Sequence, residues 1–264
     1  MARQIPSPLL IDQDQLLANL EQIWAAAQRT GFRVLLDQTA FPAWPLYPML
    51  GLYLSGTVAA NAALAEQGLR HMDRDSHGVA DGLTPPAFAD LLPWCHHMTF
   101  CTLGQWEQLG PKARERRIPC SLRVSAGEMC RSGIPLEELP DPLPNGISGL
   151  QLQLTDPSDL TALDAALDAV EHRCAAQLPQ LFQFSFGGNF PLTGPDFDLA
   201  GLEERLHRFR TRWHLLLYLE VGEAVAHNAL SPLPHPPASS SPFQEGDLPL
   251  YVKRGNRTTP FSHF

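Results

Sequence analysis

The sequence predicts a single (β/α)8 barrel, an α/β fold in which parallel strands and helices alternate around a closed sheet. Eight short apolar runs with strand character recur along the chain, separated by segments with helical spacing of apolar residues. The length of 264 residues suits one barrel of this type. The composition, 44% hydrophobic and 18% charged, is typical of an ordinary globular protein.

The first barrel strand is expected within residues 34–41, and the other predicted elements are placed relative to it. It follows a short leading strand at 7–11 and an amphipathic helix at 16–27, which Asp12 or Asp14 caps. The carboxyl end of the strand carries Asp37, Gln38 and Thr39, and in this fold such residues lie at the barrel mouth, where the chemistry takes place. The other strands are expected at 56–60, 77–81, 97–101, 121–125, 149–154, 181–186 and 214–219. Helices are expected at 43–54, through 64 and 69, from 85, and at 105–117, 157–177 and 198–213.

The barrel is expected to end near Asn228, so that residues 1–228 form the domain and 229–264 a Pro/Ser-rich linker and short tail. The run from Ser231 to Pro242 contains too many prolines and serines for helix or sheet, and predicts a flexible or polyproline segment. One further strand is expected at 248–252.

Charge and cysteine content exclude several classes of function. A net charge of −9 argues against nucleic acid as a partner. The start of the chain lacks the apolar run of a signal peptide, and no stretch approaches the ~20 apolar residues of a membrane span, so no membrane association is expected. Five scattered cysteines fit a reducing cytoplasm better than a disulfide framework.

A metal site is not expected in the run Cys95-His96-His97 with Cys101. Consecutive histidines on a strand point to opposite faces and cannot converge on one ion. This pattern favours a buried thiol and a histidine that is satisfied by hydrogen bonds.

Lysine is nearly absent, and this limits the chemistry available to the chain. Of the 19 basic residues, only Lys112 and Lys253 are lysines. A mechanism that needs a Schiff-base lysine therefore has two candidates.

Polar and glycine residues at the ends of three later strands are further candidates for a site. Glu220 and Glu223 follow the eighth strand, and Gly187-Gly188-Asn189 follow the seventh. Consecutive glycines can present backbone N–H groups to a phosphate, and phosphate sites in this fold often use these two loops. A tight turn with solvated glutamates is the competing interpretation. Gln151 and Gln153 share one face of the sixth strand, where they could bind a ligand or pair with each other.

Several segments together resemble the carboxynorspermidine decarboxylases, which belong to the alanine-racemase-like, PLP-dependent barrel decarboxylases. The segments occur in the family's order and the resemblance covers roughly residues 5–228; they are residues 7–20, 99–106, 131–139, 186–188 and 218–225.

The resemblance implies a site, and this chain departs from it at decisive positions. The family's Schiff-base lysine falls on Thr39, beside Asp37, and the histidine that stacks on the cofactor falls on Gln153. The phosphate-binding glycine triplet becomes Gly187, Gly188 and Asn189. The glutamate that faces the pyridine nitrogen is kept as Glu220, and Gly222 and Glu223 follow it, while Arg131 and Gly133 match an arginine–glycine pair on the substrate side.

These departures predict a degenerate homologue, a catalytically inactive pseudoenzyme with at most residual phosphate or PLP binding. The resemblance also implies a C-terminal β-domain, which is expected to be lacking here. Threonine cannot form a Schiff base, so we expect no cofactor. If the chain does bind one, we expect it to be PLP. Two alternatives stay open: an active lyase that uses a non-covalent cofactor or the carboxylates Asp37, Glu220 and Glu223, and a small-molecule-binding barrel. The expected partners are an active homologue and a small anionic ligand.

Overall fold

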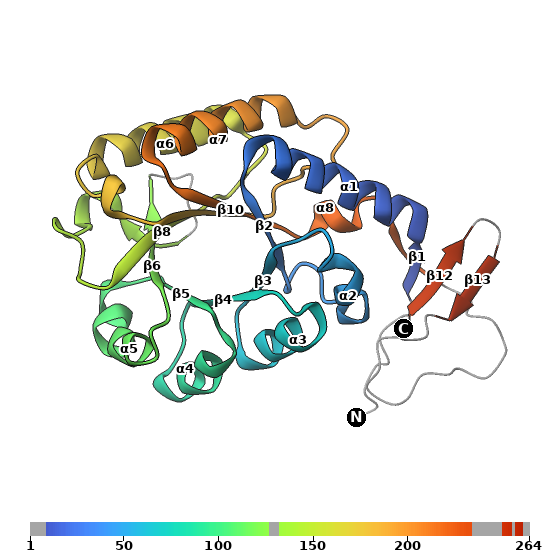
Figure 1. The fold of residues 1–264 in the computed structure, drawn as a ribbon, viewed down its shortest axis with the longest axis horizontal. Coiled ribbons are helices and arrows are strands. Elements are labelled where there is room, and N and C mark those ends of the chain that lie inside the picture. The colour runs from blue at the N-terminus through green and yellow to red at the C-terminus, as the bar shows by residue number, and fades with distance from the viewer. Residues whose placement is uncertain (1–8, 127–131, 234–249, 255–256, 261–264) are drawn as a thin grey trace.

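Eight parallel strands close into a barrel, with β5 pairing to β6 to complete the ring (Figure 1). The computed structural model describes residues 9–126, 132–233, 250–254 and 257–260. The barrel strands are β2 (Arg33–Asp37), β3 (Gly56–Ala59), β4 (Asp75–Ala80), β5 (His97–Phe100), β6 (Cys120–Ser125), β8 (Ile147–Gln153), β9 (Gln183–Gly187) and β10 (Leu216–Val221). All eight predicted strands are observed, and the predicted fold class is confirmed.

Helices cover the outside of the barrel (Figure 1). They are α1 (Gln13–Thr30), α2 (Tyr47–Leu50), α3 (Ala62–Met72), α4 (Pro85–Leu91), α5 (Leu103–Glu115), α6 (Leu160–Cys174), α7 (Leu199–Trp213) and α8 (Glu223–Ala226). Between β6 and β8 the described residues form the short strand β7 (Ile134–Pro135) and a 3-10 turn, Leu136–Glu138, in place of an α-helix. In the part of the chain that is described, no helix is long and apolar enough to cross a bilayer.

The two faces of the barrel strands carry different chemistry. On β10, Leu217 and Leu219 belong to the large apolar core between strands and helices, whereas Tyr218 and Glu220 alternate with them and face the barrel interior. The apolar cluster inside is small, comprising Leu35, Val58, Val79, Cys101 and Tyr218. The rest of the interior is polar, and this places ionisable groups along the barrel axis.

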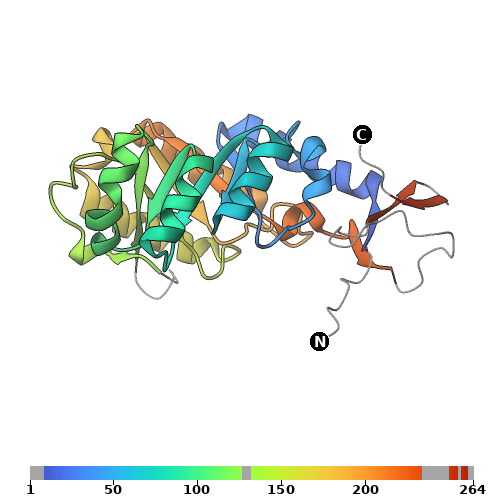
Figure 2. The same ribbon diagram turned by 90° about the horizontal axis from the view of Figure 1, so that it is seen from below.

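A second, four-stranded sheet lies beyond one side of the barrel (Figures 1 and 2). It contains β11 (Leu230–Pro232), β1 (Leu9–Asp12), β12 (Leu250–Arg254) and β13 (Arg257–Pro260), in that order. The predicted leading strand thus pairs with the tail, parallel to β12 and antiparallel to β11. The division of the chain at residue 228 stays a prediction.

The start of the predicted linker is a strand, which corrects the expectation that residues from Ser231 onward form no sheet. Pro232 pairs with Leu9 at the end of β11. A proline is tolerated there because β11 is an edge strand of its sheet. The remainder of the predicted linker, from residue 234, lies outside the described residues.

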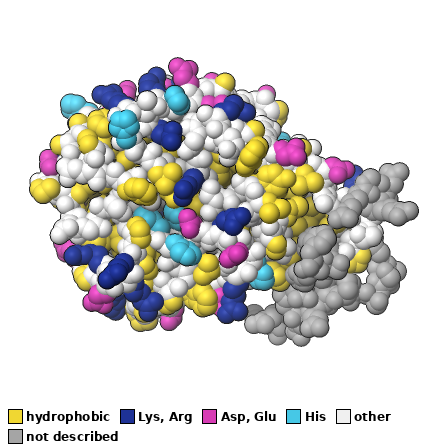
Figure 3. Space-filling model, viewed as in Figure 1, with side chains coloured by type: hydrophobic (Ala, Val, Ile, Leu, Met, Phe, Trp, Pro, Cys, Tyr) yellow, Lys and Arg dark blue, Asp and Glu magenta, His cyan; other side chains and the backbone are white. Residues whose placement is uncertain are grey.

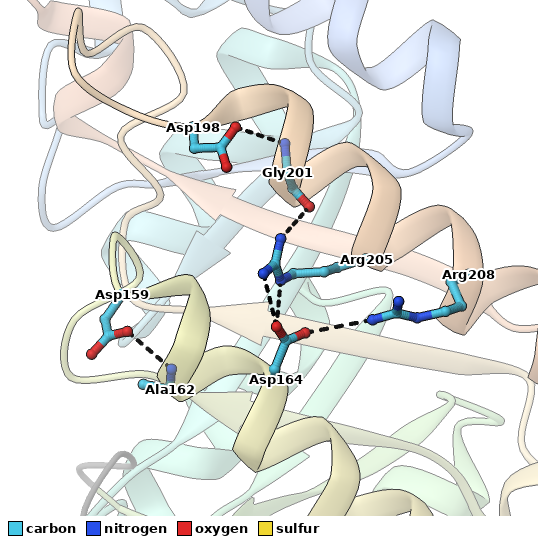
Figure 4. A network of polar contacts seen from close by, with 7 residues as sticks. All are labelled: Asp159, Ala162, Asp164, Asp198, Gly201, Arg205 and Arg208. Carbon is cyan, nitrogen blue, oxygen red and sulfur yellow. Dashed lines mark hydrogen bonds and ion pairs between the residues drawn. The ribbon is translucent and has the colours of Figure 1, made fainter.

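Helices α6 and α7 are joined by ion pairs (Figure 4). The guanidinium of Arg205 donates from Nε to Asp164 at 2.8 Å, and Arg208 lies 3.6 Å from the same carboxylate. Asp159 and Asp198 cap the two helices by accepting from Ala162 N and Gly201 N. These contacts fix the helices that follow β8 and β9, the two strands whose ends form part of the barrel mouth.

Candidate functional site

The barrel mouth contains a cavity of about 360 Å³ at the carboxyl ends of the strands. Its charged lining consists of three carboxylates, Asp37, Asp81 and Glu220, and one guanidinium, Arg123. The other lining residues are Thr39, Val58, Ala60, Val79, Ser132 and Gln153. Acidic side chains therefore outnumber basic ones at the mouth.

A chain of hydrogen bonds links side chains of β6, β8 and β10, and two of its members, Arg123 and Glu220, line this cavity. Arg123 and Gln151 are register partners on the neighbouring strands β6 and β8, and Arg123 Nε donates to Gln151 Oε1 at 2.9 Å. Gln151 Nε2 in turn donates to Glu220 Oε1 on β10 at 2.6 Å. Arg123 also donates to Ser132 Oγ at 2.9 Å and lies 3.8 Å from Asp81. The side chains of Arg123, Gln151 and Glu220 thus form one buried relay.

Glu220 is poised between its two protonation states near neutral pH. Burial raises the pKa of this carboxyl to about 7, and the charge of Asp37 adds to the effect. The guanidinium of Arg123 and the hydrogen bond from Gln151 oppose the rise in pKa. A buried carboxyl with a pKa near 7 can accept or donate a proton to a ligand in the mouth.

Thr39 stands exposed at the mouth, at the end of the first barrel strand. Asp37 fixes this turn, because its Oδ1 accepts from Thr39 N at 2.8 Å. Both lysines lie elsewhere. Lys112 is exposed on α5, on the outside of the barrel (Figure 1), and Lys253 on β12 lies 3.4 Å from Asp12 Oδ2.

The loop after β9 borders a second cavity, of about 400 Å³. Gly188 and Asn189 both have positive φ, 127° and 62°, and asparagine is one of the few non-glycine residues that tolerates this conformation. The charged side chains that line the cavity are Asp156 and Glu223, and Gln153 borders both cavities. The glycine loop is therefore observed, while anion binding there stays a prediction.

The structure brings most of the predicted site residues together. Asp37, Thr39, Gln153 and Glu220 line the mouth, and Gly188, Asn189 and Glu223 line the second cavity. Gly187, the last residue of β9, and Gly222, which follows β10, are both buried. Arg131 lies outside the described residues.

Sequence reasoning missed Arg123, Asp81 and Ser132. Arg123 sits in the middle of a strand, where its charge gave no indication of which face it occupies. The alternation with buried Leu122 and Val124 was the available signal for an inward-facing side chain. Its pairing with Gln151 depends on strand register, which a single sequence does not reveal.

A histidine pair occupies the amino-terminal part of the barrel interior. The rings of His77 and His97 lie 4.9 Å apart, and His97 Nε2 is hydrogen-bonded to Ser121 Oγ at 2.9 Å. Histidine side chains also gather at the centre of the face shown in Figure 3. Cys95 and Cys101 are buried thiols, as expected from their sequence context. Among the described residues there is no group of three or more ligands arranged to hold a metal ion.

Burial keeps both histidines neutral. It lowers the pKa of His97 to about 3, and it lowers the pKa of His77 well below the usual value, with a further decrease from the neighbouring His97. Because the folded chain keeps these two histidines neutral, lowering the pH reduces the stability of the fold.

Comparison with known proteins finds no matching family model. Two curated relatives are a carboxynorspermidine/carboxyspermidine decarboxylase from Herminiimonas arsenicoxydans and a carboxyaminopropylagmatine decarboxylase from Synechocystis. Both are 26% identical, over 83% and 84% of this chain and 63% and 61% of the relatives. The chain thus spans about 60% of their length.

Solved structures show the same fold. The carboxynorspermidine decarboxylase from Campylobacter jejuni, complexed with norspermidine, superposes with a TM-score of 0.78 at 23% identity, covering 85% of this chain and 61% of that one. A lysine decarboxylase from Selenomonas ruminantium gives a TM-score of 0.65 at 18% identity, over 85% of this chain and 65% of that one. The resemblance stated from the sequence is confirmed.

Proposed function

We propose that this chain, a relative of the carboxynorspermidine decarboxylases, is a catalytically silent barrel that has lost the covalent chemistry of those enzymes. The observation that carries the proposal is Thr39 in the turn after β2, exposed at the mouth where the family resemblance implies the Schiff-base lysine. A hydroxyl group cannot replace an amine in forming a carbon–nitrogen double bond with an aldehyde.

The two lysines of the chain do not supply the missing amine. Lys112 is on an outer helix and Lys253 is in the second sheet, beside Asp12. The residues at the mouth therefore do not fit a lysine-bound PLP cofactor. Loss of a covalent catalytic group costs many orders of magnitude in rate.

Glu220 is retained but its surroundings differ from those that the resemblance implies. Its Oε1 accepts a 2.6 Å hydrogen bond from Gln151, and its raised pKa leaves it partly protonated at neutral pH. These contacts support a role for the Glu220 carboxyl within the hydrogen-bonded relay, and not as the partner of a cofactor.

The test is release of carbon dioxide from carboxynorspermidine in the presence of added PLP. We expect the wild-type chain to release no more than PLP without protein does, and Glu220→Ala to behave identically. Wild-type turnover that Glu220→Ala abolishes would show an active lyase, and the proposal would be wrong.

A second candidate function is binding of a small cationic ligand, and the excess of carboxylates at the mouth favours it. The cavity of about 360 Å³ is within the usual size range of ligand pockets. Norspermidine, which is bound in the Campylobacter jejuni enzyme, is the natural probe. Equilibrium dialysis of norspermidine against the wild-type chain and against Asp81→Asn tests this function. Binding that weakens in the variant supports it, and no retention of norspermidine by the wild type excludes it.

A further inference from the structure

The space that two glycines leave beside the mouth is filled by the chain's own side chains. A Cβ at Gly187 would press against Gln153 Oε1 and lie 2.7 Å from Glu220 Oε2. Real Cβ atoms essentially never approach other atoms under 3.0 Å. The absence of a side chain at Gly187 therefore leaves room for the side chains of Gln153 and Glu220, which occupy the space that a Cβ would take.

Gly222 accommodates Asn189 in the same way. A Cβ at Gly222 would lie 2.8 Å from Asn189 Oδ1 and would also contact Ala40 Cβ. Asn189 Nδ2 donates to Asp37 Oδ2 at 3.2 Å, so the carboxamide bridges from the loop after β9 to the turn after β2. Three loops of the mouth thus meet around one side chain, at the third position of the glycine loop.

The charges around this bridge are unfavourable for a phosphate. Asp37 takes part in the bridge, and Asp156 and Glu223 line the adjoining cavity. Hydrogen bonds from Ser158 lower the pKa of Asp156, so it is ionised at neutral pH. The guanidinium at the mouth, Arg123, is already bonded to Gln151 and Ser132. A phosphate monoester would bring about two further negative charges to this acidic surface.

We infer that Asn189 and Asp37 are specificity-determining residues that exclude phosphate from the loop after β9, beside the mouth. The ligand group that approaches the loop after β9 is accordingly unphosphorylated. This inference rests on the second candidate function in taking the mouth as a binding site, and it replaces the expectation of an anion site at Gly187 and Gly188. It also gives a reason, separate from Thr39, why PLP does not fit this chain.

The test compares binding of inorganic phosphate to the wild-type chain and to the double variant Asn189→Gly, Asp37→Asn. Asparagine at 37 keeps the acceptor for Thr39 N, and glycine at 189 tolerates the positive φ. Phosphorus NMR titration is expected to show no binding of millimolar phosphate by the wild type. Removal of one like charge beside the anion should tighten binding about tenfold or more in the variant.

Asp168→Asn is the matched control, because it removes one exposed carboxylate on α6, away from the mouth. It should remain as unresponsive to phosphate as the wild type. Saturable phosphate binding by the wild type that also shifts the Asn189 amide resonance, in a parallel nitrogen-15 NMR titration, would overturn the inference. This outcome is measured on the wild type alone and does not depend on whether a variant folds. A folded double variant that binds no phosphate would overturn it as well. Neither the carbon dioxide assay nor the norspermidine titration measures phosphate binding, so failure of either candidate function is distinguishable from failure of this inference.

Discussion

Acidification from pH 7 to pH 4 is expected to remove a large part of the free energy of unfolding, because the barrel buries two neutral histidines. Folding lowers the pKa of His97 to about 3 and the pKa of His77 well below its usual value. The unfolded chain therefore binds protons below about pH 6.5 that the folded chain does not bind. The stability from His97 is fully present above pH 6.5 and is lost as the pH falls toward 3.

Glu220 acts in the opposite direction over part of this range. Its folded pKa is raised from 4.5 to about 7, so the stability it contributes is present below pH 4.5 and is lost as the pH rises through 7. Two histidines outweigh one carboxyl, and the net loss on acidification should be on the order of a few kcal/mol.

Urea unfolding of the wild type and of His97→Gln at a series of pH values checks this prediction. The variant should be less stable at pH 7, because the hydrogen bonds of His97 with Ser121 and Gln183 are altered, but its stability should fall less steeply with acid. Exposed His207→Gln on α7 is the control and should follow the wild type. If the free energy of unfolding falls with pH equally steeply in the wild type and in His97→Gln, His97 is not the source of the acid sensitivity.

Replacing Arg123 by methionine is expected to destabilise the chain and to raise the pKa of Glu220 above about 7. The guanidinium now opposes the rise in that pKa, and it satisfies Gln151 Oε1 in the barrel interior. A buried acceptor left without its donor costs about 1–3 kcal/mol.

The measurements are urea unfolding at pH 7 and carboxyl NMR titration of Glu220. Arg212→Met is the matched control, because Arg212 is an exposed guanidinium paired with Glu171 on the outer helices, and such pairs contribute about 0–1 kcal/mol. An unchanged Glu220 titration in Arg123→Met would show that the relay is not electrostatically coupled.

The sequence was sufficient for the barrel because its strands are short apolar runs bounded by glycine, proline and polar residues. For example, the run at residues 56–60 is observed as β3. The second sheet was not predicted, since β1 pairs with β12 across more than two hundred residues of chain. Periodicity reveals which residues form strands, and it does not reveal partners that are distant in the sequence.

For the site, the sequence predicted the residues but not the hydrogen bonds among them. Its positions came from strand ends and from the family resemblance, and the structure gathers Asp37, Thr39, Gln153 and Glu220 at one cavity. The bonding among them was not predictable. Gln151 was expected to bind a ligand or pair with Gln153, yet it bridges Arg123 and Glu220. Those contacts depend on register and rotamers across three strands.

The most direct measurement of the central claim is the mass of the intact chain after incubation with PLP and reduction with borohydride. We expect no stoichiometric increase in mass, and no visible chromophore before reduction, because Thr39 offers no amine and neither lysine lies at the mouth. A stoichiometric, reducible adduct mapped to Lys112 or Lys253 would contradict it.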